Sequence, residues 1–173
     1  MSFTAQLQSW HDVYLSSAAA GATLAGLLFV GLSLHLRTVV AHADVRALAR
    51  VTLSSFFTVV LASLYMLVPS PDPSTLGYPL LGIAAGAAVL MVRPTWRGFR
   101  NRRTRSLSLW VLAIRFGTTA LANLALGVGG AAMLGSNYAA AFQGLLIATL
   151  ILLMVSVRNT WDLLVTIADQ KPG

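Results

Sequence analysis

Five long apolar segments alternate with short polar segments along the chain. They run over residues 15–36, 51–68, 76–92, 114–134 and 138–157. A helix rises about 1.5 Å per residue, so about 20 apolar residues cross the roughly 30 Å hydrocarbon core of a bilayer. The pattern therefore predicts an all-α fold, an integral membrane bundle of five transmembrane helices that forms a single domain over residues 1–173.

Basic residues fall on one side of this alternation and so predict the orientation of the chain. Residues 93–105 hold six arginines and residues 37–50 hold three more, whereas residues 69–75 have no Lys or Arg. Short basic loops stay on the cytoplasmic side of a membrane. We therefore expect an outside N-terminus, a cytoplasmic basic loop over 93–105 and a cytoplasmic tail over 158–173. Five spans are favoured over four, because the six-arginine loop would otherwise lie outside.

The composition excludes most soluble classes of protein. Apolar residues make up 57% of the chain and charged residues 10%, whereas globular domains have about 25% charged residues. The net charge is +7, but the basic residues border apolar segments, so no nucleic acid is expected as a partner. The basic loop is instead expected to bind anionic membrane lipids, or to set the topology alone. The candidate headgroup-binding residues are Arg93, Trp96, Arg97, Arg100, Arg102, Arg103 and Arg105.

Residue types that carry out catalysis or hold metals are scarce. The chain has no Cys and no Glu, and its five Asp residues lie in tails, loops or at segment ends. The three His residues, His11, His35 and His42, do not share a helix face at a spacing of four. We therefore expect no enzyme activity, no metal site and no cofactor. An acid-driven transporter is disfavoured, because no carboxylate lies within a span.

Small residues recur at steps of four on three of the predicted helices, which favours close packing between helices. The sets are Ala18, Ala22 and Gly26 in the first span, Gly82 and Gly86 in the third, and Ala140, Gly144 and Ala148 in the fifth. Two polar residues lie within later spans, Asn123 in the fourth and Gln143 in the fifth. Such amides either join helices by hydrogen bonds or contact a pore or ligand, and the sequence leaves both interpretations open.

Aromatic residues lead into the first span. Phe3, Leu7, Trp10 and Tyr14 follow one another at steps of four, three and four, so they share one face of a helix. Trp and Tyr favour the headgroup region, because each has an apolar body and a polar tip. The pattern predicts a short interfacial helix, with Trp10 and Tyr14 anchored at the membrane boundary.

The run from Trp10 to Leu36, with its AAAGATLAGLLFVGLSLHL core, resembles a group of uncharacterised small bacterial multi-pass proteins. The resemblance implies the bacterial inner membrane. The same run is similar to the first helix of Orai calcium channels, which lines a multimeric pore. Ser33 or Leu34 stands where that family has its pore glutamate, and the five-span layout with an outside N-terminus also differs. Calcium selectivity is therefore not implied.

Two functions are compatible with these features. The first is a homo-oligomer that forms an ion channel or transport path. Its lumen would be lined by the first span, through Gly26, Gly31, Ser33, His35 and Arg37, and would favour anions or select poorly. The second is a non-catalytic accessory or regulatory subunit of a larger membrane complex, with another membrane protein as its partner. The sequence carries no catalytic motif that would favour an enzyme over either.

Overall fold

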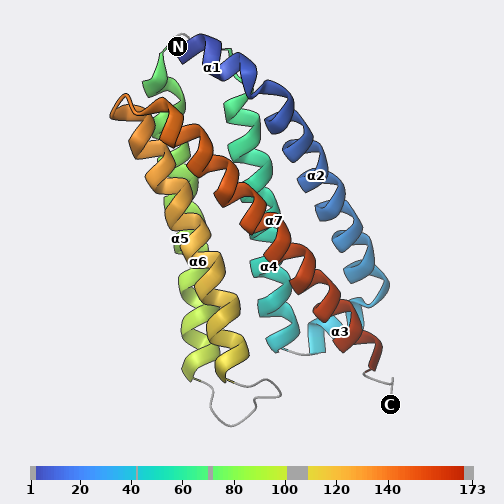
Figure 1. The fold of residues 1–173 in the computed structure, drawn as a ribbon. Coiled ribbons are helices and arrows are strands. Elements are labelled where there is room, and N and C mark those ends of the chain that lie inside the picture. Colours follow the sequence, from blue (N-terminus) through green and yellow to red (C-terminus); the bar gives the residue numbers. More distant parts are fainter. Residues whose placement is uncertain (1–2, 42, 70–71, 101–108, 170–173) are drawn as a thin grey trace.

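The computed structural model describes residues 3–41, 43–69, 72–100 and 109–169, and within these ranges the chain is helical throughout, without strands (Figure 1). The helices are α1 (Phe3–Ser9), α2 (His11–Leu34), α3 (Leu36–Ala41), α4 (Ala43–Met66), α5 (Pro73–Arg100), α6 (Leu109–Leu134) and α7 (Tyr138–Asp169). Five of them, α2, α4, α5, α6 and α7, are long and apolar enough to cross a membrane. Within the described residues, the predicted all-α architecture is therefore confirmed, with five helices that could each span a membrane.

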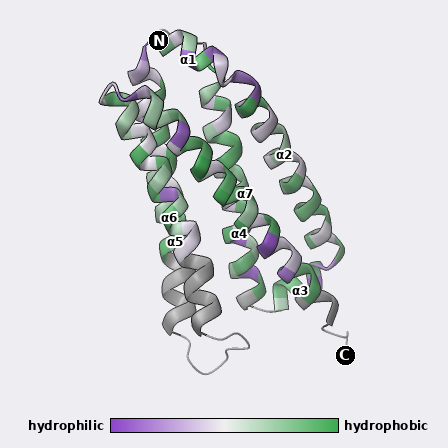
Figure 2. Cartoon of the chain, viewed as in Figure 1, coloured by the Kyte–Doolittle hydropathy of each residue, from purple (hydrophilic) through white to green (hydrophobic). Residues whose placement is uncertain are grey.

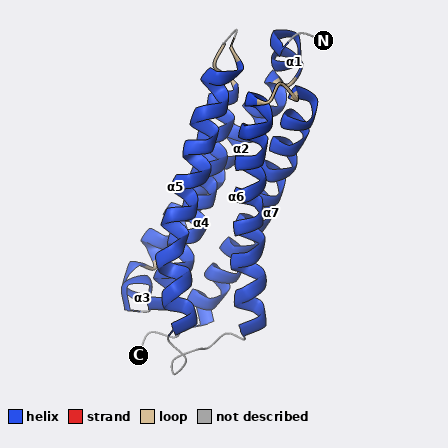
Figure 3. Ribbon diagram, turned by 90° about the vertical axis from the view of Figure 1, so that its left-hand side faces the viewer, coloured by secondary structure: helices blue, strands red, loops and turns tan. Residues whose placement is uncertain are grey.

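The four later long helices close a bundle, and α2 lies outside it. Helix α4 packs against α5 and α7, and α6 packs between α5 and α7. Helix α2 lies along α4 and meets α7 less extensively (Figure 1). The view in Figure 3 shows the long helices running along one common axis, with α1 at one end and α3 at the other. In Figure 2, apolar residues extend along the coloured parts of these helices.

The third and fifth long helices extend further than the hydropathy pattern indicates. Residues 93–100, predicted as the start of a loop, continue α5 to Arg100. Pro94 does not end the helix. A proline lacks only its own backbone N–H donor, so the backbone hydrogen bonds of the neighbouring turns can still form. Likewise α7 continues to Asp169, so most of the predicted tail is helix. The first span ends two residues earlier than predicted, at Leu34.

A tight turn joins α6 to α7. The Asn137 N–H donates to the Ala132 carbonyl at 3.1 Å, and the Ser136 N–H donates to the Met133 carbonyl at 3.4 Å. These two bonds form a Schellman motif, which satisfies carbonyls that the helix end leaves free. Ser136 adopts the left-handed conformation with φ of 63°. Glycine is the usual residue there, because a Cβ atom is strained in that region.

Close helix packing occurs at glycines other than those in the predicted small-residue sets. A Cβ atom on Gly130 of α6 would lie 3.1 Å from the Gly77 carbonyl oxygen of α5. By contrast, Gly82 and Gly86 have no atom within 4 Å of a Cβ position, so the GxxxG pair of α5 makes no helix contact within one chain. Among the described residues, the close packing predicted for this pair is absent within one chain, and packing against another copy stays a prediction. Larger side chains such as Leu80 face the bundle, where they bury more apolar surface.

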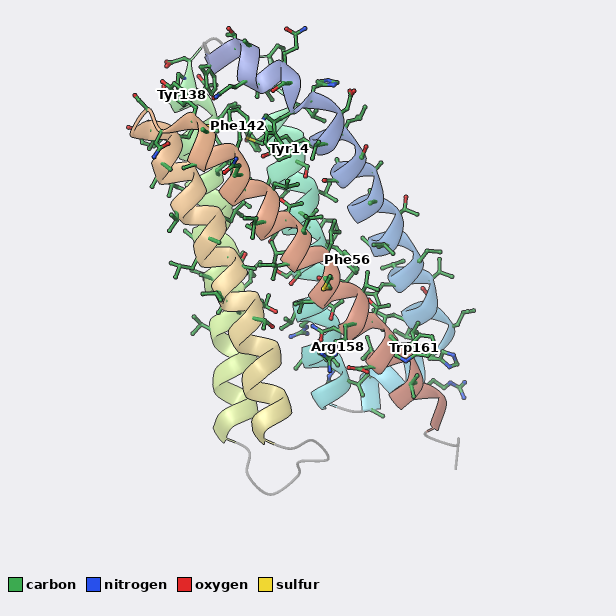
Figure 4. The ribbon with its side chains drawn as sticks, in the orientation of Figure 1. Tyr14, Phe56, Tyr138, Phe142, Arg158 and Trp161 are labelled. Atoms are coloured by element: carbon green, nitrogen blue, oxygen red, sulfur yellow. The ribbon has the colours of Figure 1, made fainter. Side chains whose placement is uncertain are left out.

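The N-terminal aromatic residues form a cluster with the start of α7. Phe3 packs against Tyr138 with ring centroids 5.1 Å apart, and Trp10 stacks on Phe142 at 6.1 Å. The Tyr14 hydroxyl donates to the Phe142 carbonyl at 3.3 Å, and only 1% of Tyr14 is exposed (Figure 4). The short N-terminal helix is confirmed. Tyr14, however, is a core residue and not a boundary anchor, because its polar tip has a protein partner.

Candidate functional site

Helix α2 has one packed face and a broad open one. Its buried residues are Tyr14, Ser17, Ala18, Gly21, Ala25, Leu28 and Leu32. The spacing of three and four residues places them on one stripe, which packs on α4. Among the glycines of α2, Gly21 approaches α4 most closely, since its Cβ position lies 3.0 Å from Val60. The opposite surface exposes large apolar side chains, including Leu27 and Phe29 at 64% and 66% exposure.

The predicted pore-lining residues do not share one environment. Gly26 lies on the open surface with no atom within 4 Å of its Cβ position, whereas Gly31 is half-buried against Leu164 of α7. Ser33 is exposed and donates its hydroxyl hydrogen to the Phe29 carbonyl at 2.6 Å. Gly26, Ser33, His35 and Arg37 are exposed, so a lumen formed by α2 would require neighbouring subunits.

His35 and Arg37 lie where α2 gives way to α3. His35 interrupts the helix with φ of −119° and ψ of 31°, and both side chains are exposed. The Val39 N–H donates to the His35 carbonyl at 3.1 Å, which starts the next helical turn. Arg46 of α4 donates to the Val40 carbonyl at 2.8 Å and so holds α3 against α4. An exposed imidazole and an exposed guanidinium therefore lie two residues apart in sequence, just past the end of α2.

Asn123 lies at the edge of a groove between α5 and α6. The groove has a volume of about 1070 Å³ and is lined mainly by small apolar residues such as Ala84, Ala88 and Gly127. Asn123 is 4% exposed, and its Nδ2 donates to the Thr119 carbonyl at 3.0 Å. The same nitrogen lies 3.7 Å from the Met91 sulfur on α5, so the amide links the two helices. Its Oδ1 has no hydrogen-bond partner among the described residues.

The other predicted site residues lie on the surface or outside the described part of the chain. Gln143 is exposed, near the start of α7. The backbone of residues 93–100 belongs to α5, but their side chains lie outside the described part, as do residues 102, 103 and 105 entirely. Headgroup binding by the basic stretch therefore stays a prediction. The described residues contain no group of three or more His, Cys, Asp or Glu that could hold a metal ion.

Sequence reasoning missed a set of buried polar residues on α4 and α7. Asn159 was assigned to a cytoplasmic tail, yet it is 2% exposed inside the bundle, and Ser63 and Ser156 are fully buried. Their spacing holds a usable signal. Thr149, Ser156 and Asn159 follow one another at steps of seven and three, as one helix face requires. Serine and threonine are common in membrane helices, so this spacing alone does not identify a buried polar face.

Comparison of the chain with protein-family models, curated proteins and solved structures gave no match. The residues that bear on function are therefore taken from this chain alone: the open α2 surface with His35 and Arg37, the Asn123 groove, and the buried polar residues of α4 and α7.

Proposed function

We propose that this chain is a small protein of the bacterial inner membrane that assembles with copies of itself to form an ion channel or transport path. The observation that supports the proposal is the open surface of α2. Among the five long helices, α2 has the smallest buried share of its apolar window, 28%, against 50% for α4. A helix that is packed on one face and apolar on the other has surface available for a second subunit or for lipid.

Small residues on the open surface favour contact with a second subunit over contact with lipid. Ala22 and Gly26 are both exposed and lie one turn apart, with open space beyond Gly26. In lipid, small residues at this spacing let another helix backbone approach closely. Closed cyclic symmetry is the usual outcome of self-association, and it would place the α2 helices of all subunits around a shared axis.

The chemistry of the open surface suggests what such a path would pass. Ser33, His35 and Arg37 are exposed at one end of α2, and no acidic residue lies among them. A positive ring favours anions over cations.

The orientation proposed for the chain places its N-terminus outside and its C-terminus in the cytoplasm. Among the described basic residues, Arg37 lies in α3, Arg46 and Arg50 lie in the first two turns of α4, and Arg158 lies in the C-terminal half of α7. Helix α3 lies at the end of the bundle away from the N-terminus (Figure 1). Basic segments of short loops stay in the cytoplasm. Reporters fused at residues 2, 74, 101 and 173 test this orientation. A reporter at residue 101 that is accessible from outside would contradict it.

Cysteine cross-linking tests the self-association. The natural chain has no cysteine, so each single variant carries one reactive thiol. Oxidation of the Gly26→Cys protein in native membranes should give a disulfide-linked dimer. Leu124→Cys on α6 is the matched control, because residue 124 is 64% exposed on a different helix. Equal cross-linking of both variants would indicate random collision, and a product with a foreign protein would favour the accessory-subunit alternative.

Flux through liposomes tests the path itself. Liposomes with the parent protein should release a trapped anion faster than empty liposomes. Gly26→Leu should slow that release by filling the lumen, and His35→Ala should change it by removing a polar side chain from the path. Release that neither substitution changes would exclude α2 from the path. Well-folded parent protein without any flux would instead support the alternative, a non-catalytic accessory subunit that covers its open α2 surface with another membrane protein.

A further inference from the structure

Buried polar side chains lie on both α4 and α7, two helices that pack against each other. Six of them are at most 3% exposed. They are Thr52, Ser55 and Ser63 on α4, and Thr149, Ser156 and Asn159 on α7. Helix α4 also carries buried apolar residues between its buried polar residues. Polar and apolar layers therefore alternate along the helix.

Three apolar clusters fix the register between the two antiparallel helices. Near the α3 end, Ala49 of α4 and Leu163 of α7 belong to one packed cluster. In the middle, Val59 and Leu152 pack together with Ala122 of α6. Toward the other end, Ala62 and Ala148 share a third cluster. Steps of three and four residues along each helix carry the register from one cluster to the next.

This register places four polar residues in one enclosed region. Ser55 lies one turn from Val59, and Ser156 lies one turn from Leu152 in the same direction. Ser55 and Ser156 therefore lie at the same height along the bundle axis. Thr52 and Asn159 lie about one further turn along, at the next level. The region is bounded by the Val59–Leu152 layer on one side and the Ala49–Leu163 layer on the other.

Hydrogen bonds within the protein leave this region rich in free acceptors. The Thr52 hydroxyl donates to the Leu48 carbonyl at 2.9 Å, and the Ser55 hydroxyl donates to the Val51 carbonyl at 3.0 Å. Each hydroxyl has thereby used its only hydrogen, and its oxygen can still accept. The Ser156 Oγ and the Asn159 Oδ1 are buried and have no partner among the described residues.

Buried polar atoms in native proteins nearly always have a partner, and water supplies it where protein groups do not. Water fits this region because it is small, uncharged and carries two donor hydrogens. The four side chains are themselves uncharged and offer no carboxylate to an ion. We propose that α4 and α7 enclose an internal hydration site, in which Thr52, Ser55, Ser156 and Asn159 bind water between two apolar layers.

This site is separate from the open α2 surface, and it does not depend on the function proposed above. It places water near the middle of α4 and inside a single subunit. The layer of Val59, Ala122 and Leu152 then separates this water from the opposite end of the bundle.

Hydrogen–deuterium exchange of single thiols tests the site. The natural chain has no cysteine, so each variant gives a single S–H stretching band in the infrared. Ser55→Cys and Ser156→Cys place the thiol in the polar region with little change in size. Val59→Cys is the matched control, because Val59 is fully buried on the same helix, one turn from Ser55. All three proteins are first compared with the parent by helix content and elution volume.

The Ser55→Cys and Ser156→Cys thiols should exchange in D₂O at least about tenfold faster than the Val59→Cys thiol, because internal water carries deuterium to them without opening of the bundle. Equally slow exchange of all three thiols would overturn the proposal and would indicate a dry helix contact.

A measurement on the unmodified side chains covers the case in which the cysteine variants fold poorly. Solid-state NMR can follow magnetisation from water protons to the methyl group of Thr52 in the parent protein in lipid. A clear transfer is expected there, and it should be lost in Asn159→Leu but kept in Ser33→Ala, which changes an exposed serine on α2. Absence of transfer to Thr52 in the parent protein would refute the site.

Discussion

The contact between Gly130 of α6 and Gly77 of α5 gives a stability prediction that separates steric cost from helix propensity. A Cβ atom added at Gly130 would meet the Gly77 carbonyl oxygen at 3.1 Å, the Leu80 Cβ at 3.2 Å and the Leu81 nitrogen at 3.3 Å. Two of these are backbone atoms, which cannot move without shifting α5. Gly130→Ala should therefore force the two helices apart locally. Overpacking of this kind costs about 1–3 kcal/mol.

Gly117→Ala on the same helix isolates the steric cost. No atom of the described residues lies within 4 Å of the Gly117 Cβ position, so an added methyl group meets none of them. Both substitutions gain the same helix propensity, about 1 kcal/mol in favour of Ala over Gly. This gain cancels when the two variants are compared. Gly130→Ala should thus be less stable than Gly117→Ala by about 1–3 kcal/mol, the overpacking cost alone.

Reversible unfolding in detergent measures this difference. The purified proteins are titrated from mild-detergent micelles into SDS, and unfolding is followed by tryptophan fluorescence. Trp10 is a suitable reporter, because its ring stacks on Phe142 in the folded bundle. If Gly130→Ala and Gly117→Ala unfold with the same free energy, the close approach of α5 and α6 at Gly77 is absent, and the packing described for this end of the bundle is wrong.

Three further substitutions test local features by the same unfolding measurement. Ser136→Gly should stabilise the protein by about 0.5–1 kcal/mol, because glycine adopts the left-handed conformation without strain; a loss of stability would argue against the positive φ. Tyr14→Phe should destabilise it by about 0.5–1.5 kcal/mol through loss of the hydrogen bond to Phe142, and an unchanged free energy would indicate that the hydroxyl contacts solvent. Asn123→Leu removes both the Oδ1 atom without a partner and the Nδ2 hydrogen bond to the Thr119 carbonyl, two effects of about 1 kcal/mol and opposite sign, so the free energy of unfolding should change by less than about 1 kcal/mol; a larger loss of stability would show that the amide makes further hydrogen bonds.

Hydropathy identified the long helices because lipid cannot hydrogen-bond the backbone. Every N–H and C=O group in a span must then pair within the chain, so an apolar segment of about 20 residues is driven to form a helix. The same pattern predicted the short N-terminal helix from the spacing of Phe3, Leu7 and Trp10. Hydropathy did not identify the residues at which the helices end. Pro94 is tolerated inside α5, although proline commonly ends a helix.

The faces on which the helices pack were decided only by the tertiary structure. A transmembrane helix is apolar on its lipid side as well as its packed side, so hydrophobic periodicity does not separate the two. Gly82 and Gly86 have the spacing of a packing motif and face open space, whereas Gly130 packs against Gly77 without such a motif. The buried polar region arises in the same way. Ser55 and Ser156 lie about 100 residues apart in the sequence, and the register of α4 against α7 brings them to one level because the apolar clusters on either side interlock.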